Sequence, residues 1–252
     1  MKPLVVLGLD LAGSPRRPTG ACTLRALEAK TALLFGDDEI LSLVETVRPD
    51  LVTVDAPLTL PPGRTSIEDR NGEHYRPCDL ELRERGIPFF PITLGPMRML
   101  TVRGILLKES LETRGFRIME MYPGGAQDVW NLPRAKRDAA GLRRGLARLG
   151  IRGLGRNPSD HELDAATGAL VGLMFLQGKA GYYGDLETGA ILMPKDKPPR
   201  KNPTTVLSSR PAARGLNRGA PRGGKGRRID SPPGRRSAGV PRGPDERSRE
   251  RR

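Results

Sequence analysis

The chain has 252 residues and a formal net charge of +14, but this charge is distributed unevenly. Residues 195–252 hold 18 of the 43 Lys and Arg residues and 5 of the 29 Asp and Glu residues, so residues 1–194 are close to neutral. The two cysteines, Cys22 and Cys78, form neither a metal-ligand spacing nor a disulfide framework. No apolar run approaches the roughly 20 residues needed to span a bilayer. The N-terminal run is too short for a signal peptide, and we expect a cytoplasmic protein.

The composition divides the chain into a domain and a tail. Residues 195–252 lack Phe, Trp and Tyr and are rich in Pro, Gly, Ser and Arg. Such a segment cannot bury enough apolar surface to offset the entropy of ordering it, so we predict a disordered basic tail. The tail could be an electrostatic arm for nucleic acid, or an incidental extension without a role. Residues 1–194 have the size of one domain with a single core.

The first half of the domain begins with apolar and weakly alternating segments. We predict a buried strand at 4–11, followed across short turns by strands at 19–27 and 30–35. Short turns make these three strands antiparallel neighbours. Three acidic residues then open a helix whose positive end suits their charge. Pro49 ends that helix, and a further core strand is predicted at 51–54.

The second half is predicted to contain an irregular segment, several helices and one strand. In chain order these are an irregular segment at 57–95 with a short helix at 79–85, a helix at 100–114, a strand at 116–121, one or two basic helices within 127–150 and a buried helix at 160–176. Residues 190–193 are a candidate for one further short strand. The helix at 100–114 is expected to turn Leu106, Leu107 and Leu111 inward. Ser159 and Glu162 form a capping box that begins the buried helix.

This order of elements predicts a mixed α/β fold. Strands that follow helical crossovers should run parallel to the first strand. We therefore predict a five-stranded mixed sheet with helices on both faces. If the strands at 4–11, 51–54 and 116–121 are neighbours, their carboxyl ends share one edge, where ligands bind in sheets of this kind.

Four acidic residues occupy positions that an apolar core should exclude: Asp10, Asp55, Glu120 and Asp164. A carboxylate at such a position is costly unless it is paired, hydrogen-bonded or bound to a metal. Asp160 lies one helical turn before Asp164 on the same face. Carboxylates suit Mg²⁺ or Mn²⁺, and two such ions can stabilise the attacking and leaving oxygens of a phosphoryl displacement. We predict the first four residues as catalytic, and all five as metal ligands.

Structural explanations compete with the functional one at several of these positions. Asp10 and Asp55 precede turn signals, where aspartate often binds its own backbone. Glu120 could face solvent from an edge strand, and Asp160 could serve only the helix dipole. His161 could be a ligand or a proton carrier, or merely a partly exposed side chain.

Basic residues gather around the irregular segment. Arginine supplies much of the affinity of proteins for a phosphate backbone. We therefore predict that Arg64, Arg76, Arg98 and Arg103 contact nucleic acid, either RNA or DNA. The alternative is an ordinary solvated surface, which would also explain Arg70 nearby.

Several motifs resemble known families. Residues 8–14 resemble the opening of RNase H-like nucleases, including the Holliday-junction resolvases, and residues 161–166 resemble the terminal helix of those resolvases. More closely, the chain is similar to domain-of-unknown-function family 429, a predicted RNase H-like nuclease family, over about residues 3–195. The matching stretches are 10–14, 54–57, 76–79, 120–124 and 160–165. The resemblance implies an RNase H-like fold and metal-dependent nuclease activity. The segment 58–95 departs from a minimal RNase H core, which leaves the substrate open.

Three functions fit these features. In a metal-dependent nuclease, Asp10 would bridge two ions, and Asp55 and Glu120 would each hold one. Asp164, together with Asp160 or His161, would complete the site. In a non-catalytic nucleic-acid-binding protein that kept the fold, the tail would carry the binding. A phosphotransferase of the actin and sugar-kinase class is disfavoured, because such enzymes place a nucleotide between two copies of the fold.

Overall fold

The computed structural model describes residues 2–70 and 72–195. Apart from Lys195, the predicted tail at 195–252 lies outside the described residues. Within the described ranges, no helix is both long enough and apolar enough to cross a membrane.

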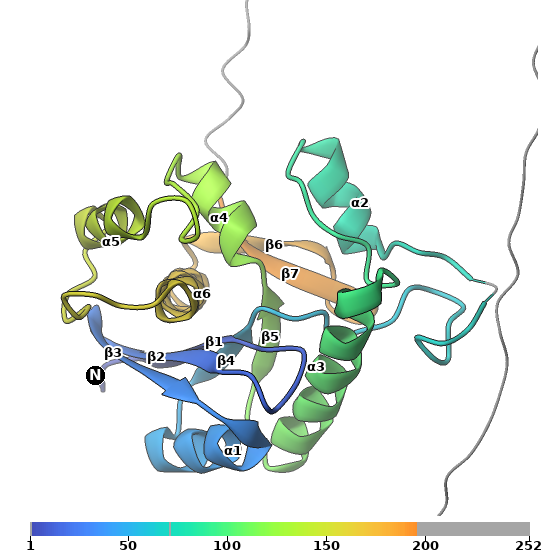
Figure 1. Cartoon of the computed structure of the whole chain (residues 1–252), viewed down its shortest axis with the longest axis horizontal. Coiled ribbons are helices and arrows are strands. Elements are labelled where there is room, and N and C mark those ends of the chain that lie inside the picture. The colour runs from blue at the N-terminus through green and yellow to red at the C-terminus, as the bar shows by residue number, and fades with distance from the viewer. Residues whose placement is uncertain (1, 71, 196–252) are drawn as a thin grey trace, which may run out of the picture. The chain divides into compact units, whose positions relative to one another are not determined.

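The described residues form one seven-stranded mixed sheet with the order β3-β2-β1-β4-β5-β7-β6 (Figure 1). The strands are β1 Val5–Asp10, β2 Thr19–Arg25, β3 Glu28–Leu34, β4 Leu51–Val54, β5 Ile118–Met121, β6 Ala180–Asp185 and β7 Gly189–Pro194. The first three strands pair antiparallel, and β4 and β5 run parallel to β1, as predicted.

The predicted number of five strands was wrong, because the C-terminal hairpin joins the same sheet. Strand β7 pairs parallel with β5, and β6 pairs antiparallel with β7. Only the region of β7 was a candidate strand in the sequence. Strand β6 was missed because its sequence, with two glycines among six residues, lacks the alternation of a half-buried strand.

Six helices accompany the sheet in the described residues. They are α1 Gly36–Val47, α2 Pro77–Glu84, α3 Gly95–Thr113, α4 Pro123–Val129, α5 Ala139–Arg148 and α6 Asp160–Leu176. Helix α3 begins five residues earlier than predicted, with Pro96 in its first turn, where proline is well tolerated. The capping box of α6 is confirmed: the Ser159 hydroxyl accepts the Glu162 amide at 3.2 Å, and the Ser159 amide donates to the Glu162 carboxylate at 2.9 Å.

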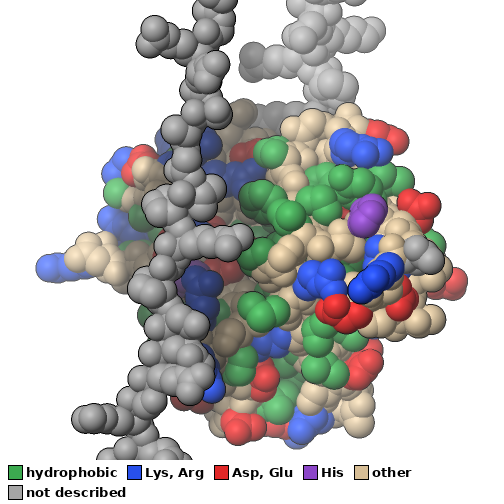
Figure 2. Space-filling view, turned by 45° about the vertical axis from the view of Figure 1, so that its right-hand side comes forward, with side chains coloured by type: hydrophobic (Ala, Val, Ile, Leu, Met, Phe, Trp, Pro, Cys, Tyr) green, Lys and Arg blue, Asp and Glu red, His purple; other side chains and the backbone are tan. Residues whose placement is uncertain are grey.

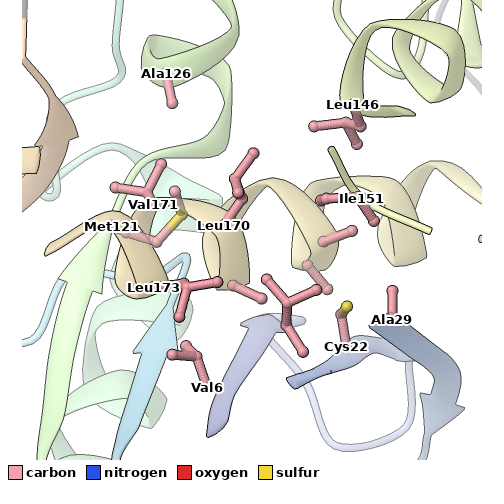
Figure 3. Close-up of a cluster of buried hydrophobic side chains, with 14 of the residues drawn as sticks. Val6, Cys22, Ala29, Met121, Ala126, Leu146, Ile151, Leu170, Val171 and Leu173 are labelled. Carbon is pink, nitrogen blue, oxygen red and sulfur yellow. The ribbon is translucent and has the colours of Figure 1, made fainter. Parts of the chain in front are cut away.

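Helices cover both faces of the sheet, as predicted (Figure 1). One face packs against α6, with α4 and α5 beyond it, and Figure 3 shows Leu170 and Leu173 of α6 above Val6 and Cys22 of the sheet. The other face packs against α1 and α3. Leu107 and Leu111 of α3 are buried, but Leu106 is 59% exposed, so its predicted inward orientation was wrong.

The C-terminal hairpin also forms the support for α2. Cys78 and Leu82 of α2 pack against Tyr183, Ile191 and Met193 of β6 and β7 in a separate buried cluster. The added strands therefore hold in place a helix that belongs to the otherwise irregular segment.

Helix α6 lies unusually close to the sheet at two glycines. A Cβ atom on Gly8 of β1 would lie 2.1 Å from the carbonyl oxygen of Ala165, and one on Gly20 of β2 would lie 2.1 Å from that of His161. Both obstacles are helix backbone, which cannot move aside as a side chain can. Glycine at these positions therefore sets the distance between α6 and the sheet.

We expect Gly8→Ala and Gly20→Ala each to lower the free energy of unfolding by about 1–3 kcal/mol or more, because the added methyl group overpacks the helix–sheet contact. Urea denaturation measures this change. Gly181→Ala on β6 is the matched control, since a Cβ there meets nothing within 4 Å. Equal stability of all three variants would contradict this account of the packing.

Candidate functional site

The four core-edge carboxylates come together at one edge of the sheet. Asp10 ends β1, Asp55 follows β4, Glu120 lies in β5, and Asp164 lies in the second turn of α6. Because β1, β4 and β5 are parallel, their carboxyl ends meet on the same side. Asp55, Glu120 and Asp164 line one cavity of about 450 Å³.

Asp10 makes its closest contact with a side chain of α6. Its Oδ2 lies 2.5 Å from Nδ1 of His161, and the two side chains are 15% and 31% exposed. The hydrogen bond to Asp10 raises the pKa of His161 above its usual value, although partial burial opposes the rise. Nδ1 of His161 therefore donates to the Asp10 carboxylate, and protonation of the ring would offset part of the charge on Asp10.

Asp55 lies among like charges. Burial raises the pKa of Asp55 well above its usual value, and the charges of Asp10, Asp164 and Glu120 raise it further. The guanidinium of Arg134 opposes this rise. Among the described residues, no side chain donates a hydrogen bond to the Asp55 carboxylate, so its charge is poorly compensated.

Asp164 is held in position by an amide. Gln127 of α4 donates from Nε2 to the Asp164 carboxylate at 2.7 Å, and the same nitrogen lies 3.2 Å from the Thr167 hydroxyl. Burial raises the pKa of Asp164 to about 6, the Gln127 hydrogen bond opposes the rise, and the charge of Asp10 adds to it. The folded state therefore favours protonation of this carboxyl group.

Glu120 has a different environment, because both of its oxygens are paired with Arg76. The two N–H···O distances are 2.6 and 2.8 Å, and the Leu58 amide donates to the same carboxylate at 2.9 Å. Arg76 also pairs with Asp79 at 2.8 Å, and all three side chains are buried. Burial raises the pKa of Glu120, and the charge and hydrogen bonds of Arg76 oppose that rise.

The site thus has a compensated part and an uncompensated part. Glu120, predicted as a metal ligand with an available carboxylate, is instead held by a buried guanidinium. Asp10, Asp55 and Asp164 have no arginine paired with them in this way. Within the described ranges, no group of three or more His, Cys, Asp and Glu side chains lies close enough together to hold a metal ion as placed.

The remaining predicted ligand, Asp160, lies at the start of α6 and affects the site through its charge. That charge raises the pKa of both Asp164 and His161. Asp160 also occupies the first turn of the helix, where an acid complements the dipole. The favourable interaction of Asp160 with the helix dipole is therefore sufficient to explain an acid at this position.

The arginines predicted to bind nucleic acid have partners within the protein. Arg64 donates to the backbone carbonyls of residues 69, 72 and 73 and closes that loop. Arg98 pairs with Glu68, and Arg103 donates to Asp37 and to the carbonyl of residue 12. Arg64, Arg76 and Arg98 thus hold parts of the segment 57–95 in place, whereas Arg103 joins α3 to residues 12 and 37.

Three polar residues of the site were missed in the sequence. Gln127 orients Asp164, and Arg134 and Lys136 line the cavity. Arg134 is held by Asp128 and by the Tyr122 hydroxyl at 3.0 Å. All three follow residues 120–124 in the sequence. Their position shortly after that motif is the one feature of the sequence that could have marked them as site residues.

Fold and site together define a mixed α/β protein with an acidic cavity at the carboxyl edge of its parallel strands. The chain belongs to the family described as "Protein of unknown function (DUF429)", whose model matches residues 8–188. This finding confirms the family that the five sequence motifs indicated. A comparison with curated proteins gave no match.

Two solved structures resemble the chain loosely. The structure of Thermus thermophilus RuvC has 16% sequence identity and a TM-score of 0.37, and the match covers 69% of this chain and 97% of that chain. T. thermophilus RuvC in complex with a Holliday junction substrate has 17% identity and a TM-score of 0.36, with 69% and 96% covered. Similarity at this level carries no functional conclusion, which has to come from the site itself.

We expect Arg76→Ala to lower the free energy of unfolding by about 3–5 kcal/mol, because it leaves Glu120 and Asp79 buried without a counter-charge. Urea denaturation measures the loss. Lys108→Ala removes a partly exposed ion pair with Glu112 and should change stability by less than about 1 kcal/mol. In the Arg76→Ala background, Glu120→Gln should recover part of the loss. If it recovers nothing, the two side chains are not coupled as described.

We expect Asp164→Asn to stabilise the protein in EDTA at neutral pH. A carboxyl group whose pKa is raised on folding stabilises the fold at low pH, and this contribution is lost as pH rises from about 4 to about 6. The introduced asparagine cannot ionise, so the stability of the variant should not fall in this way. The difference in the free energy of unfolding between the variant and the wild type should therefore grow by roughly 2–3 kcal/mol across that interval and then stay constant. Urea denaturation at a series of pH values measures it. Parallel pH profiles for the two proteins would contradict the assignment.

Proposed function

We propose that this protein is a metal-dependent nuclease in which strands β1 to β5 form an RNase H-like core. Hydrolysis of a phosphodiester would occur at Asp10, Asp55 and Asp164, the carboxylates that have no arginine partner. The strand order, the position of the acids at the carboxyl edge and the family motifs all support this proposal.

One observation carries the proposal. The carboxylate of Asp55 is only partly buried and lines the cavity, near the charges of Asp10 and Asp164, and no described side chain donates a hydrogen bond to it. An arrangement that only stabilised the fold would pair this charge, as Arg76 pairs Glu120. An Asp55 carboxylate without a partner lowers the stability of the fold. This cost has an explanation if a bound metal cation interacts with the carboxylate.

The donor set fits Mg²⁺ or Mn²⁺, because it consists of carboxylate oxygens without cysteine. Asp10, Asp55 and Asp164 would hold the metal, and Glu120 would do so only if it were released from Arg76. Metal bound there would supply hydroxide at neutral pH and offset the negative charge on the reacting phosphate.

The protein's own side chains have separate tasks in this reaction. Gln127 keeps the Asp164 carboxylate turned toward the site, and His161 does the same for Asp10. Arg134, braced by Asp128 and Tyr122, places a positive charge on the cavity wall, where it can attract a phosphate.

A non-catalytic nucleic-acid-binding protein is less well supported by the described residues. Four arginines of the described residues that could take part in such binding are engaged with acids or backbone carbonyls of the same chain. Apart from Lys195, the tail, which this alternative expects to carry the binding, lies outside the described residues. A binding role would also leave the unpaired charge of Asp55 without an explanation.

The proposal is tested by incubating the full chain with single-stranded, branched and RNA–DNA hybrid substrates in Mn²⁺ or Mg²⁺. We expect cleavage that EDTA abolishes. Asp10→Asn and Asp55→Asn should each lower the rate by about 100-fold or more, because each removes charge from the reacting centre.

Asp38→Asn is the matched control, since Asp38 is an exposed aspartate on α1 and should leave the rate unchanged. Cleavage that persists at the wild-type rate in Asp10→Asn would show that it does not come from this site and would refute the proposed function. Absence of cleavage on every substrate with either ion would refute the proposed function.

A further inference from the structure

The cavity that contains the carboxylates also has an extensive apolar lining. These side chains come from α2, from the loop that follows it and from the start of α3: Leu82, Phe89, Phe90, Ile92, Met97 and Leu100. A site that only gripped a phosphate and a cation would need no such surface. The lining therefore points to an apolar or aromatic part of the substrate.

Phe90 is unusual among these residues because it remains exposed. It is 69% exposed, whereas Ile92 and Leu82 are 1% and 2% exposed and belong to the core. Proline residues at positions 88 and 91 restrict the backbone on both sides of it. An aromatic ring held at the mouth of a cavity by a stiff loop is suited to stacking against a planar ligand.

The surrounding surface agrees with this interpretation. Figure 2 brings forward the side of the molecule formed by α2 and α3, and hydrophobic side chains gather there among charged ones. Leu94 and Met99, which are near Phe90 in sequence, are 49% and 59% exposed.

The polar part of the same cavity can hold a phosphate when a cation offsets its acids. Arg134 and Lys136 line it together with Asp55, Glu120 and Asp164, and Arg76 and Asp79 are paired with each other beside them. Its volume of about 450 Å³ is typical of a site for one small molecule. A base inside a duplex cannot enter such a cavity unless it first leaves the stack.

We propose that the cavity binds one unpaired nucleotide, with its base against Phe90 and the apolar lining and its phosphate beside Arg134, Lys136 and the carboxylates. This inference rests on the proposed function and narrows its substrate class. The nuclease acts on single-stranded or unpaired nucleotides, and an intact duplex is a poor substrate.

The test measures binding separately from cleavage. Calorimetry with the full chain, in EDTA and again in Ca²⁺, compares AMP with ribose 5-phosphate, which lacks the base. We expect AMP to bind at least about tenfold more tightly in one or both conditions. Phe90→Ala should remove most of this difference, since stacking of one base contributes a factor of about ten or more.

Phe35→Ala is the matched control, because Phe35 is 52% exposed and does not line the cavity. It should bind AMP as the wild type does, and both variants should keep the wild-type melting temperature. A single-stranded oligonucleotide should also bind more tightly than the blunt duplex of the same sequence.

The two proposals fail in different ways. No preference for AMP over ribose 5-phosphate, or an unchanged preference in Phe90→Ala, overturns the nucleotide site even if Asp10-dependent cleavage is found. Equal binding of duplex and single strand overturns it as well. If AMP binding depends on Phe90 but nothing is cleaved, the nuclease proposal fails and the base-binding site stands.

Discussion

The close contact between α6 and the first two strands determines the geometry of the whole site. Gly8 and Gly20 allow the helix backbone to approach the sheet to a distance that any side chain would prevent. Asp164 and His161 project from this helix, whereas Asp10 belongs to the strand beneath it. The distance between α6 and the sheet therefore also sets how far Asp164 and His161 lie from Asp10.

Charge balance divides the acids that this packing brings together. Glu120 and Asp79 share the buried guanidinium of Arg76, which satisfies both carboxylates within the protein. Asp55 has no equivalent partner among the described residues and is surrounded by like charges. A protein can retain such an unfavourable group when a ligand compensates it, because binding then recovers the free energy that folding lost. The contrast between Glu120 and Asp55 indicates where that ligand would bind.

Much of this arrangement could be predicted from the sequence. Acids directly after apolar runs located Asp10 and Asp55, and the parallel crossovers brought them to one edge. The state of Glu120 could not be predicted, because its partner Arg76 lies in an irregular segment whose path depends on long-range contacts. Strand β6 was missed because pairing with β7, rather than its own sequence pattern, makes it a strand. Local patterns therefore predicted which acids meet, but not which of them is compensated.

The segment 57–95 contributes both to the charge balance and to the apolar surface of the cavity. Its Arg76 pairs with Glu120, so that this carboxylate is not free to bind a cation. Its Phe90 adds an aromatic surface to the same cavity. The hairpin of β6 and β7 holds α2 of this segment against the sheet. The same segment also gives the cavity beside Asp55 and Asp164 much of its apolar lining. A cavity with carboxylates on one side and an aromatic surface on the other agrees with the proposed binding of one unpaired nucleotide.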